Sequence, residues 1–301
     1  MNLNRIIQRA RLSLRRQPRV VVVAPGSLQL GERSLAGHCE QVLGVAPETA
    51  WRLSGRNNNL SLRVLANGVV LKVFECHSVA QAGAVASALE HLHAAGVAAP
   101  RLHGVSDHVV FADWVKGTPG KALSRNELAW RIPQALARLH QVRPKVETSV
   151  TPHVHWLLER LQQLAAPHAS ESRVLTVVED LRDRAPPDSP LAVIHPDFIP
   201  ANLVLTDDEA LVPVDNEFLA VGRGMELDAL NAADALYRRW PRARERFIER
   251  WLAMVDGATL SSHRSWWEAL LQVQRIGGAF ARGKTGKGMQ FFARLEKLLD
   301  E

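Results

Sequence analysis

The stretch LAVIHPDFIPANLVLTDDEALVPVDNEF, residues 191–218, carries most of the information about the architecture of this chain. Two short apolar runs, 203–205 and 210–214, flank a polar turn, a pattern that predicts a β-hairpin. A hairpin brings its two open ends together, so we expect Asn202 and Asp215 to lie side by side. An amide oxygen and a carboxylate suit Mg²⁺, which takes its other ligands from water and substrate phosphates.

A second carboxylate precedes this hairpin. Asp197 lies five residues before Asn202, in a loop stiffened by Pro196 and Pro200. A carboxylate in that loop can face the same space and accept a proton from an attacking hydroxyl group. Taken alone, each acid is more simply interpreted as a turn cap or a solvent-exposed side chain. The combination of two acids and an amide favours a metal-assisted site over unrelated turns.

An unusual lysine marks a second region of interest. Residues 51–74 predict three antiparallel strands. Apolar and polar residues alternate over 60–64, and Asn67-Gly68 forms a tight turn into the third strand. Lys72 lies within that strand among apolar residues, where an ammonium group is costly unless an anion compensates it. A solvent-facing lysine on an edge strand is the alternative interpretation.

Other segments supply the remaining expected elements. An alanine-rich helix follows the three strands and ends at Gly96. The apolar run 109–115 predicts a strand, and the turn-rich KGTPG at 116–120 predicts a boundary between lobes. Helical spacing begins at Asn126 and continues toward the hairpin region.

Length and composition exclude several classes of protein. The 301 residues, 47% of them hydrophobic, are enough for a full core and two lobes. The apolar run 20–24 is far shorter than the roughly 20 residues that cross a bilayer, and no signal-peptide core precedes it. We therefore expect no transmembrane segment and a cytoplasmic location. Cys39 and Cys76 form no CxxC pair, so two buried thiols are expected rather than a disulfide or zinc site.

The formal net charge of +6 is concentrated near the start and at residues 238–250. Residues 3–14 place apolar side chains on one helical face and arginines on the others, which predicts a basic amphipathic helix. Residues 1–19 can then contact an anionic membrane. Packing on the protein itself is favoured, because the apolar face is short and lacks an aromatic anchor. No nucleic-acid partner is expected, since no recognition motif accompanies the charge.

A phosphate-loop pattern near the end of the chain is a competing nucleotide site. Gly278, Gly283, Lys284 and Thr285 match G-x-x-x-x-G-K-[ST]. The pattern binds phosphate only where a strand precedes the loop and a helix follows it. Residues 265–276 predict a helix instead. We interpret the loop as a glycine-lysine turn between two helices.

The spacing H-x-D-x-x-x-x-N, followed thirteen residues later by Asp, resembles the catalytic core of the aminoglycoside phosphotransferase and choline kinase-like family. These enzymes are small-molecule relatives of the protein kinases. The motif is formed here by His195, Asp197, Asn202 and Asp215. The resemblance extends from about Leu35 to Asp228. It implies an α+β, two-lobed protein-kinase-like fold, with a small antiparallel-sheet N-lobe and a mainly helical C-lobe.

The resemblance also implies roles for single residues. Asp197 is expected to be the catalytic base, Asn202 and Asp215 to hold Mg²⁺, and Lys72 to contact the phosphates of ATP. Further nucleotide-binding positions are expected at Ser54, Gly55, Asn59, Asp113 and Val115. His195 and Asp228 are expected to brace the catalytic loop. The implied activity is ATP-dependent phosphate transfer to a hydroxyl group of a small molecule.

The resemblance also predicts how the chain divides into lobes, and the sequence departs from the family at one position. We expect a basic N-terminal extension over 1–34, an N-lobe over 35–116 and a helical C-lobe over 117–301. The glutamate that pairs with the strand lysine in the family aligns near Val85. Glu90 is the substitute candidate.

The acceptor is inferred from charge. Six arginines crowd residues 238–250, which disfavours a polycationic aminoglycoside and favours a neutral or anionic sugar-type acceptor. A solvated helix face explains the same arginines equally well. Three alternatives remain open: a kinase-like pseudoenzyme that acts as a binding or regulatory module, a lipopolysaccharide-core sugar kinase at the membrane surface, and a phosphate-loop NTPase centred on Lys284.

Overall fold

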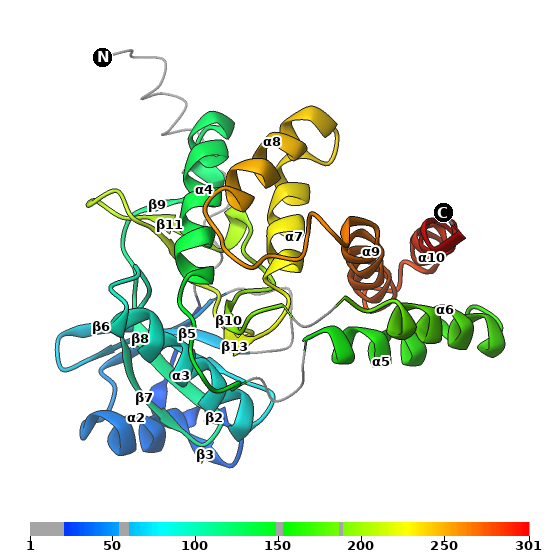
Figure 1. Cartoon of the computed structure of the whole chain (residues 1–301). Helices are drawn as coiled ribbons and strands as arrows, with labels where there is room; N and C mark the ends of the chain where they lie inside the picture. Colours follow the sequence, from blue (N-terminus) through cyan, green and yellow to red (C-terminus); the bar gives the residue numbers. More distant parts are fainter. Residues whose placement is uncertain (1–20, 54–59, 149–152, 187–188, 301) are drawn as a thin grey trace. The chain divides into compact units, whose positions relative to one another are not determined.

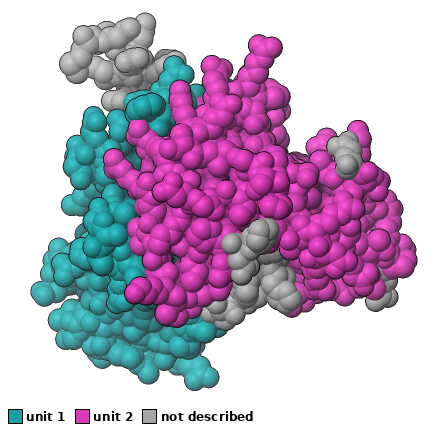
Figure 2. Space-filling view, viewed as in Figure 1, with its two compact units in different colours: residues 1–131, 200–220 teal, residues 132–199, 221–301 magenta. Residues whose placement is uncertain are grey.

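The computed structural model describes residues 21–53, 60–148, 153–186 and 189–300 (Figure 1). The chain forms two compact units, which Figure 2 distinguishes by colour. Unit 1 comprises residues 1–131 and 200–220, and unit 2 comprises residues 132–199 and 221–301. Each unit therefore combines two separate stretches of the chain.

Unit 1 is built on a six-stranded antiparallel sheet with the order β1-β4-β5-β6-β8-β7. Its strands are β1 (Val21–Val23), β4 (Thr49–Arg52), β5 (Ser61–Ala66), β6 (Val69–Glu75), β7 (Leu102–Ser106) and β8 (Val109–Asp113). Asn67 and Gly68, both with positive φ, join β5 to β6. Positive φ at both central residues is the geometry of the tight hairpin turn. The predicted Asn-Gly hairpin is confirmed.

One face of this sheet packs on a small helix. Ser34 caps α2 (Leu35–Leu43) by accepting a hydrogen bond from the Gly37 amide. α2 contributes Leu35 and Cys39 to a core completed by alternate residues of β5 and β6, such as Leu62 and Leu71. Because neighbouring strand residues point to opposite faces, Arg63 and Lys72 lie on the other face of the sheet. A second helix, α3 (Val79–Ala94), packs against β7 and β8.

Both cysteines are buried free thiols, as the sequence predicted. Burial, with Glu40 adding to it, raises the pKa of Cys39 to about 12. Burial, with Glu217 adding to it, raises the pKa of Cys76 to about 12. Both thiols are therefore protonated at neutral pH and act as small apolar side chains.

The predicted hairpin of residues 203–214 also belongs to unit 1. β11 (Leu203–Leu205) pairs antiparallel with β12 (Leu211–Pro213), and β9 (Thr118–Pro119) pairs with the other edge of β11. A Cβ at Gly117 would lie 2.2 Å from the carbonyl oxygen of Leu205, so only glycine allows this close approach. The remaining short elements of unit 1 are η1 (Pro25–Ser27), β2 (Gln29–Leu30), β3 (Arg33–Ser34), η2 (Gly120–Ala122) and η3 (Pro200–Asn202).

Unit 2 is mainly helical. The helices are α4 (Arg125–His140), whose first residues belong to unit 1, α5 (His153–Ala165), α6 (Glu171–Asp183), α7 (Met225–Tyr237), α8 (Pro241–Leu252), α9 (Arg264–Phe280) and α10 (Thr285–Asp300). Two short strands, β10 (Ala192–Ile194) and β13 (Ala220–Gly222), pair with each other. α7 is buried along nearly its whole length, as expected of a core helix. α9 packs against α5, α7 and α10.

The glycine-lysine loop lies between two helices, as predicted. α9 ends at Phe280, α10 begins at Thr285, and Gly283 takes a positive φ in the connection. The element before the loop is a helix rather than the strand that a phosphate loop requires. The context of a phosphate-loop NTPase centred on Lys284 is therefore missing.

The structure confirms the expected α+β fold class, with an antiparallel-sheet N-terminal region and a mainly helical C-terminal part. Among the described helices, none combines the length and the apolar character that crossing a membrane requires. The amphipathic segment 1–19 lies outside the described residues. The division of the chain at residues 34 and 116 remains a prediction, although residues 21–23 join the sheet as β1.

Candidate active site

Lys72 projects from β6 in the middle of the sheet of unit 1. Its ammonium donates hydrogen bonds to the carbonyl of Val214 and, at 3.3 Å, to Oδ1 of Asp215. Its Nζ also lies 5.1 Å from the centre of the Phe74 ring. The lysine side chain is only 13% exposed, and β6 lies between β5 and β8. The edge-strand interpretation is therefore wrong, and Asp215 supplies the anion that the buried ammonium requires.

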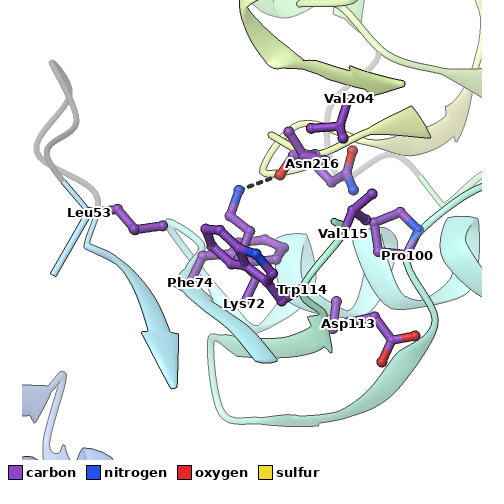
Figure 3. A pocket seen from close by; sticks show the side chains of 11 residues that line it. Leu53, Lys72, Phe74, Pro100, Asp113, Trp114, Val115, Val204 and Asn216 are labelled. Carbon is purple, nitrogen blue, oxygen red and sulfur yellow. Dashed lines mark hydrogen bonds between the residues drawn. The ribbon is translucent and has the colours of Figure 1, made fainter. Parts of the chain in front are cut away.

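A pocket of unit 1 opens beside this lysine (Figure 3). Its cavity volume is about 130 Å³. The lining comes from the end of β4, from β6, from β8 and the residues after it, and from the β11–β12 hairpin. The lining residues are Leu53, Lys72, Phe74, Pro100, Ala112, Asp113, Trp114, Val115, Val204, Val214 and Asn216. The walls are mostly apolar with a few polar groups, which is typical of a small-molecule site.

Residues 113–115, at the end of β8 and just after it, form one wall of this pocket, and we call this segment the hinge. The Asp113 amide donates to Arg101 and the Trp114 amide donates to Val70. Within the described part of the chain, the Val115 amide makes no backbone hydrogen bond. The carboxylate of Asp113 lies 2.7 Å from Nε2 of His103 and points away from Lys72 in Figure 3. The hinge therefore offers its backbone, rather than an acidic side chain, to a ligand.

The two expected metal ligands lie at the open end of the β11–β12 hairpin. Asn202 ends η3 and Asp215 follows β12. The Val214 amide donates to the Asn202 carbonyl at 2.9 Å, which ties the two ends together. An amide oxygen and a half-exposed carboxylate are oxygen ligands of the kind that Mg²⁺ takes from proteins. Elsewhere among the described residues, no three His, Cys, Asp or Glu side chains gather as a metal site.

Helix α3 is bonded to the loop after Asp215 through the side-chain amide of Gln81, where the family resemblance had predicted a glutamate. Glu90, the substitute candidate for a lysine partner, is exposed, and Val85 is a buried core residue. Gln81 instead donates from Nε2 to the Glu217 carbonyl at 2.7 Å and accepts from the His77 amide at 2.9 Å. The sequence marks Gln81 only as part of an S-x-x-Q capping signature. Nothing in the sequence predicted the hydrogen bond from Gln81 to Glu217.

The loop of Asp197 belongs to unit 2 and is held by α7. Asp228 Oδ2 accepts the His195 amide at 2.6 Å, and Asn231 donates to the Pro196 carbonyl at 2.8 Å. His195 is buried, whereas Asp197 is exposed. The structure therefore shows Asp228 bonded to the loop as a brace. Sequence reasoning missed Asn231.

The structure thus places the expected residues in three groups. Lys72, Asp113 and Val115 line one pocket, and Asn202 and Asp215 share the hairpin end beside it. Asp197 lies in the other unit. The remaining expected positions, Ser54, Gly55 and Asn59, lie outside the described residues.

Comparison with protein families and solved structures gives independent information. A family model described as "Phosphotransferase enzyme family" matches residues 51–253. A comparison with curated proteins finds no match.

Solved structures share the fold at low sequence identity. A fructosamine-3-kinase homologue from Thermobifida fusca has a TM-score of 0.57 and 18% identity, covering 87% of this chain and 100% of its own. Choline kinase LicA from Streptococcus pneumoniae has a TM-score of 0.59 and 13% identity, covering 87% and 96%. A streptomycin-ATP complex of the aminoglycoside phosphotransferase APH(2″)-IIa gives 0.59 and 14%, covering 87% and 97%. LicA has also been crystallised with AMP.

Proposed function

Because the chain belongs to the phosphotransferase enzyme family, we propose that it transfers the γ-phosphate of ATP, with Mg²⁺, to a hydroxyl group of a small molecule. Membership of this family makes the chain a small-molecule phosphotransferase. The choice of ATP and Mg²⁺ is supported chiefly by one observation. The buried ammonium of Lys72 lies at 3.3 Å from Asp215, on the wall of a mostly apolar pocket.

The pocket supports a purine nucleotide as the donor. The backbone of the hinge offers polar groups to the edge of a base. Among the described residues, the Val115 amide makes no backbone hydrogen bond and can donate to the base. Leu53 and Val204 supply apolar walls for its faces. Two structural neighbours were crystallised with ATP or AMP. In this proposal Ser54, Gly55 and Asn59 cover the phosphates.

The polar residues have separate tasks in the transfer. Asn202 and Asp215 would hold Mg²⁺, which supplies charge neutralisation on the phosphates when bound. Lys72 would give up part of its bond to Asp215 and contact phosphate oxygens. Asp197 would accept the proton of the acceptor hydroxyl, a step worth about 10²–10⁴ in rate.

The charge of unit 2 supports a neutral or anionic sugar-type acceptor rather than an aminoglycoside. Arg239, Arg242 and Arg246 are exposed, and none of them forms an ion pair with a described acid. Unpaired positive charge repels a polycation and attracts an anion. A lipopolysaccharide-core sugar meets the same charge preference as a free sugar or phosphosugar. The cytoplasm, where ATP is available, is the location that this activity requires.

A kinase assay with Asp197→Asn tests the proposal. ATP consumption is measured against a panel of sugars, phosphosugars, lipopolysaccharide core and kanamycin. We expect wild type to phosphorylate a neutral or anionic member of the panel, and the variant to lose about a hundredfold or more in kcat. Mg-ATP binding should be retained, because the variant leaves the pocket of unit 1 intact.

The matched control is Asp208→Asn, which alters an exposed acid in the turn of the β11–β12 hairpin. It should keep wild-type kcat. Full activity in Asp197→Asn would refute its role as the base. Kanamycin as the best acceptor would refute the charge argument, and Mg-ATP binding without any transfer would favour the pseudoenzyme.

A further inference from the structure

A chain of four buried groups runs through unit 2 to the loop that carries Asp197. The indole Nε1 of Trp251 donates to Nδ1 of His140 at 3.0 Å, and Nε2 of His140 lies 3.2 Å from Oδ2 of Asp228. The same carboxylate oxygen accepts the His195 amide at 2.6 Å. None of these four residues is more than 1% exposed. The chain joins α8, α4 and α7 to the loop after β10.

The direction of each hydrogen bond fixes the position of the imidazole proton. An indole nitrogen can only donate, so Nδ1 of His140 must accept and carries no proton. The proton then lies on Nε2 and points at Asp228. A proton added to Nδ1 would face the indole N–H of Trp251, with two donors opposed. Trp251 therefore selects the neutral tautomer that donates to Asp228.

Asp228 depends on both of its donors. Its Oδ1 is buried and finds no hydrogen-bond partner among the described residues, so Oδ2 carries the whole interaction. A buried carboxylate that loses a donor is strongly disfavoured. Nearby acids of α7 are engaged elsewhere: Glu226 binds Thr259, and Asp234 binds arginines. Asp228 is thus the charged partner of His140 in the described part of unit 2.

We infer that Trp251 is a positioning residue: it keeps His140 neutral with its proton on Nε2, and so holds Asp228 on the His195 amide at the base of the Asp197 loop. The hydrogen-bond chain is observed in the structure, and only its effect on catalytic rate rests on the proposed function. Of the three side chains of Trp251, His140 and Asp228, only that of Asp228 bonds directly to the loop. Trp251 acts through two intermediates.

Hydrogen exchange of the loop tests this inference without any substrate. The variant is Trp251→Phe, and the matched control is Trp266→Phe. Trp266 is also buried, but its indole donates to the Leu181 carbonyl, remote from this chain of bonds. We expect the peptide covering 192–199 to exchange about tenfold faster in Trp251→Phe, the effect of weakening one hydrogen bond to a charged group. In Trp266→Phe its protection should equal that of wild type.

The comparison of the two tryptophan variants separates the hydrogen bond to His140 from simple packing, because each variant replaces a buried indole by the same smaller ring. Equal protection of the loop in both tryptophan variants would overturn the inference.

Two changes at His140 keep the test decisive if Trp251→Phe folds poorly. His140→Gln retains an N–H donor near the position of Nε2 and should keep the loop protected. His140→Phe removes that donor and should expose it. Equal exchange in these two variants would also overturn the inference. Because Asp197→Asn should leave the exchange pattern unchanged, failure here is distinct from failure of the proposed phosphotransfer.

Discussion

Single residues show how charge is managed in the interior. Lys72 is an ammonium among apolar strand residues, and its charge predicted an anionic partner, for which the family resemblance implied the phosphates of ATP. The partner itself, Asp215, could be anticipated only through the hairpin end that holds it. The expected glutamate of α3 was not found, because α3 presents Gln81 and Val85 where an acid was sought. The sequence thus predicts that Lys72 needs an anionic partner, but it does not identify which residue supplies that anion.

Asp234 is the most heavily paired acid of unit 2. It is 6% exposed and bonds to Arg238, Arg244 and Arg275 on three parts of the helical bundle. Burial acts to raise the pKa of Asp234, but the three guanidinium groups outweigh it and hold that pKa below its ordinary value. The carboxylate therefore holds α7, α8 and α9 together.

We predict that Asp234→Asn lowers the free energy of unfolding by about 3–5 kcal/mol at neutral pH, since it removes the central acid of a largely buried ion-pair network and takes from Arg275 its acid partner among the described residues. A group with a lowered folded pKa contributes stability that is present above its unfolded value, about 3.9, and is lost as pH falls through the folded value. The difference from wild type should therefore shrink below about pH 4. Urea unfolding across the acid range measures it.

The control is Asp180→Asn, which removes a more exposed helix ion pair with Arg184. It should cost at most about 1 kcal/mol. A difference between wild type and Asp234→Asn that grows as the pH falls would contradict the prediction.

Elements with strong turn signals were predictable from the sequence. Asn67-Gly68 located the β5–β6 hairpin, and the polar turn at 206–209 located the β11–β12 hairpin. β1, β10 and β13 have only three residues each, too few for a period-two pattern to show. Their existence depends on partners that the sequence does not reveal.

The link between α3 and the metal loop is an element-scale feature that sequence reasoning missed. We predict that Gln81→Ala weakens Mg-ATP binding about fivefold, the equivalent of one neutral hydrogen bond of ~1 kcal/mol. The reason is that the Glu217 carbonyl loses its donor and the loop after Asp215 is held less firmly. Calorimetric titration with Mg-ATP measures the affinity.

Ser78→Ala is the matched control, because Ser78 caps the same helix turn without reaching Glu217. It should lower thermal stability and leave the affinity unchanged. Gln81→Glu keeps the size of the side chain but cannot donate at neutral pH, so it should behave like the alanine variant. Wild-type affinity in both Gln81 variants would refute the positioning role.

At the scale of the molecule, each compact unit draws on distant parts of the sequence. Residues 200–220 join the first 131 residues in unit 1, because β9 pairs with β11 and because Gly117 and Gly120 allow the two backbones to approach closely. The sequence predicts the position of each hairpin, but it does not predict that β9 pairs with β11 and brings residues 200–220 into unit 1. The fold class was still predictable, because the spacing of His195, Asp197, Asn202 and Asp215 resembles that of a family with this fold.

The central claim is that nucleotide binds at Lys72 and not at the glycine-lysine loop. A thermal-shift titration with Mg-ATP on wild type, Lys72→Ala and Lys284→Ala tests it most directly. At a hundredfold excess over Kd, binding stabilises a protein by about 2.7 kcal/mol. We predict that wild type and Lys284→Ala show this shift in Tm and that Lys72→Ala loses most of it. A shift that survives in Lys72→Ala and disappears in Lys284→Ala would contradict the account.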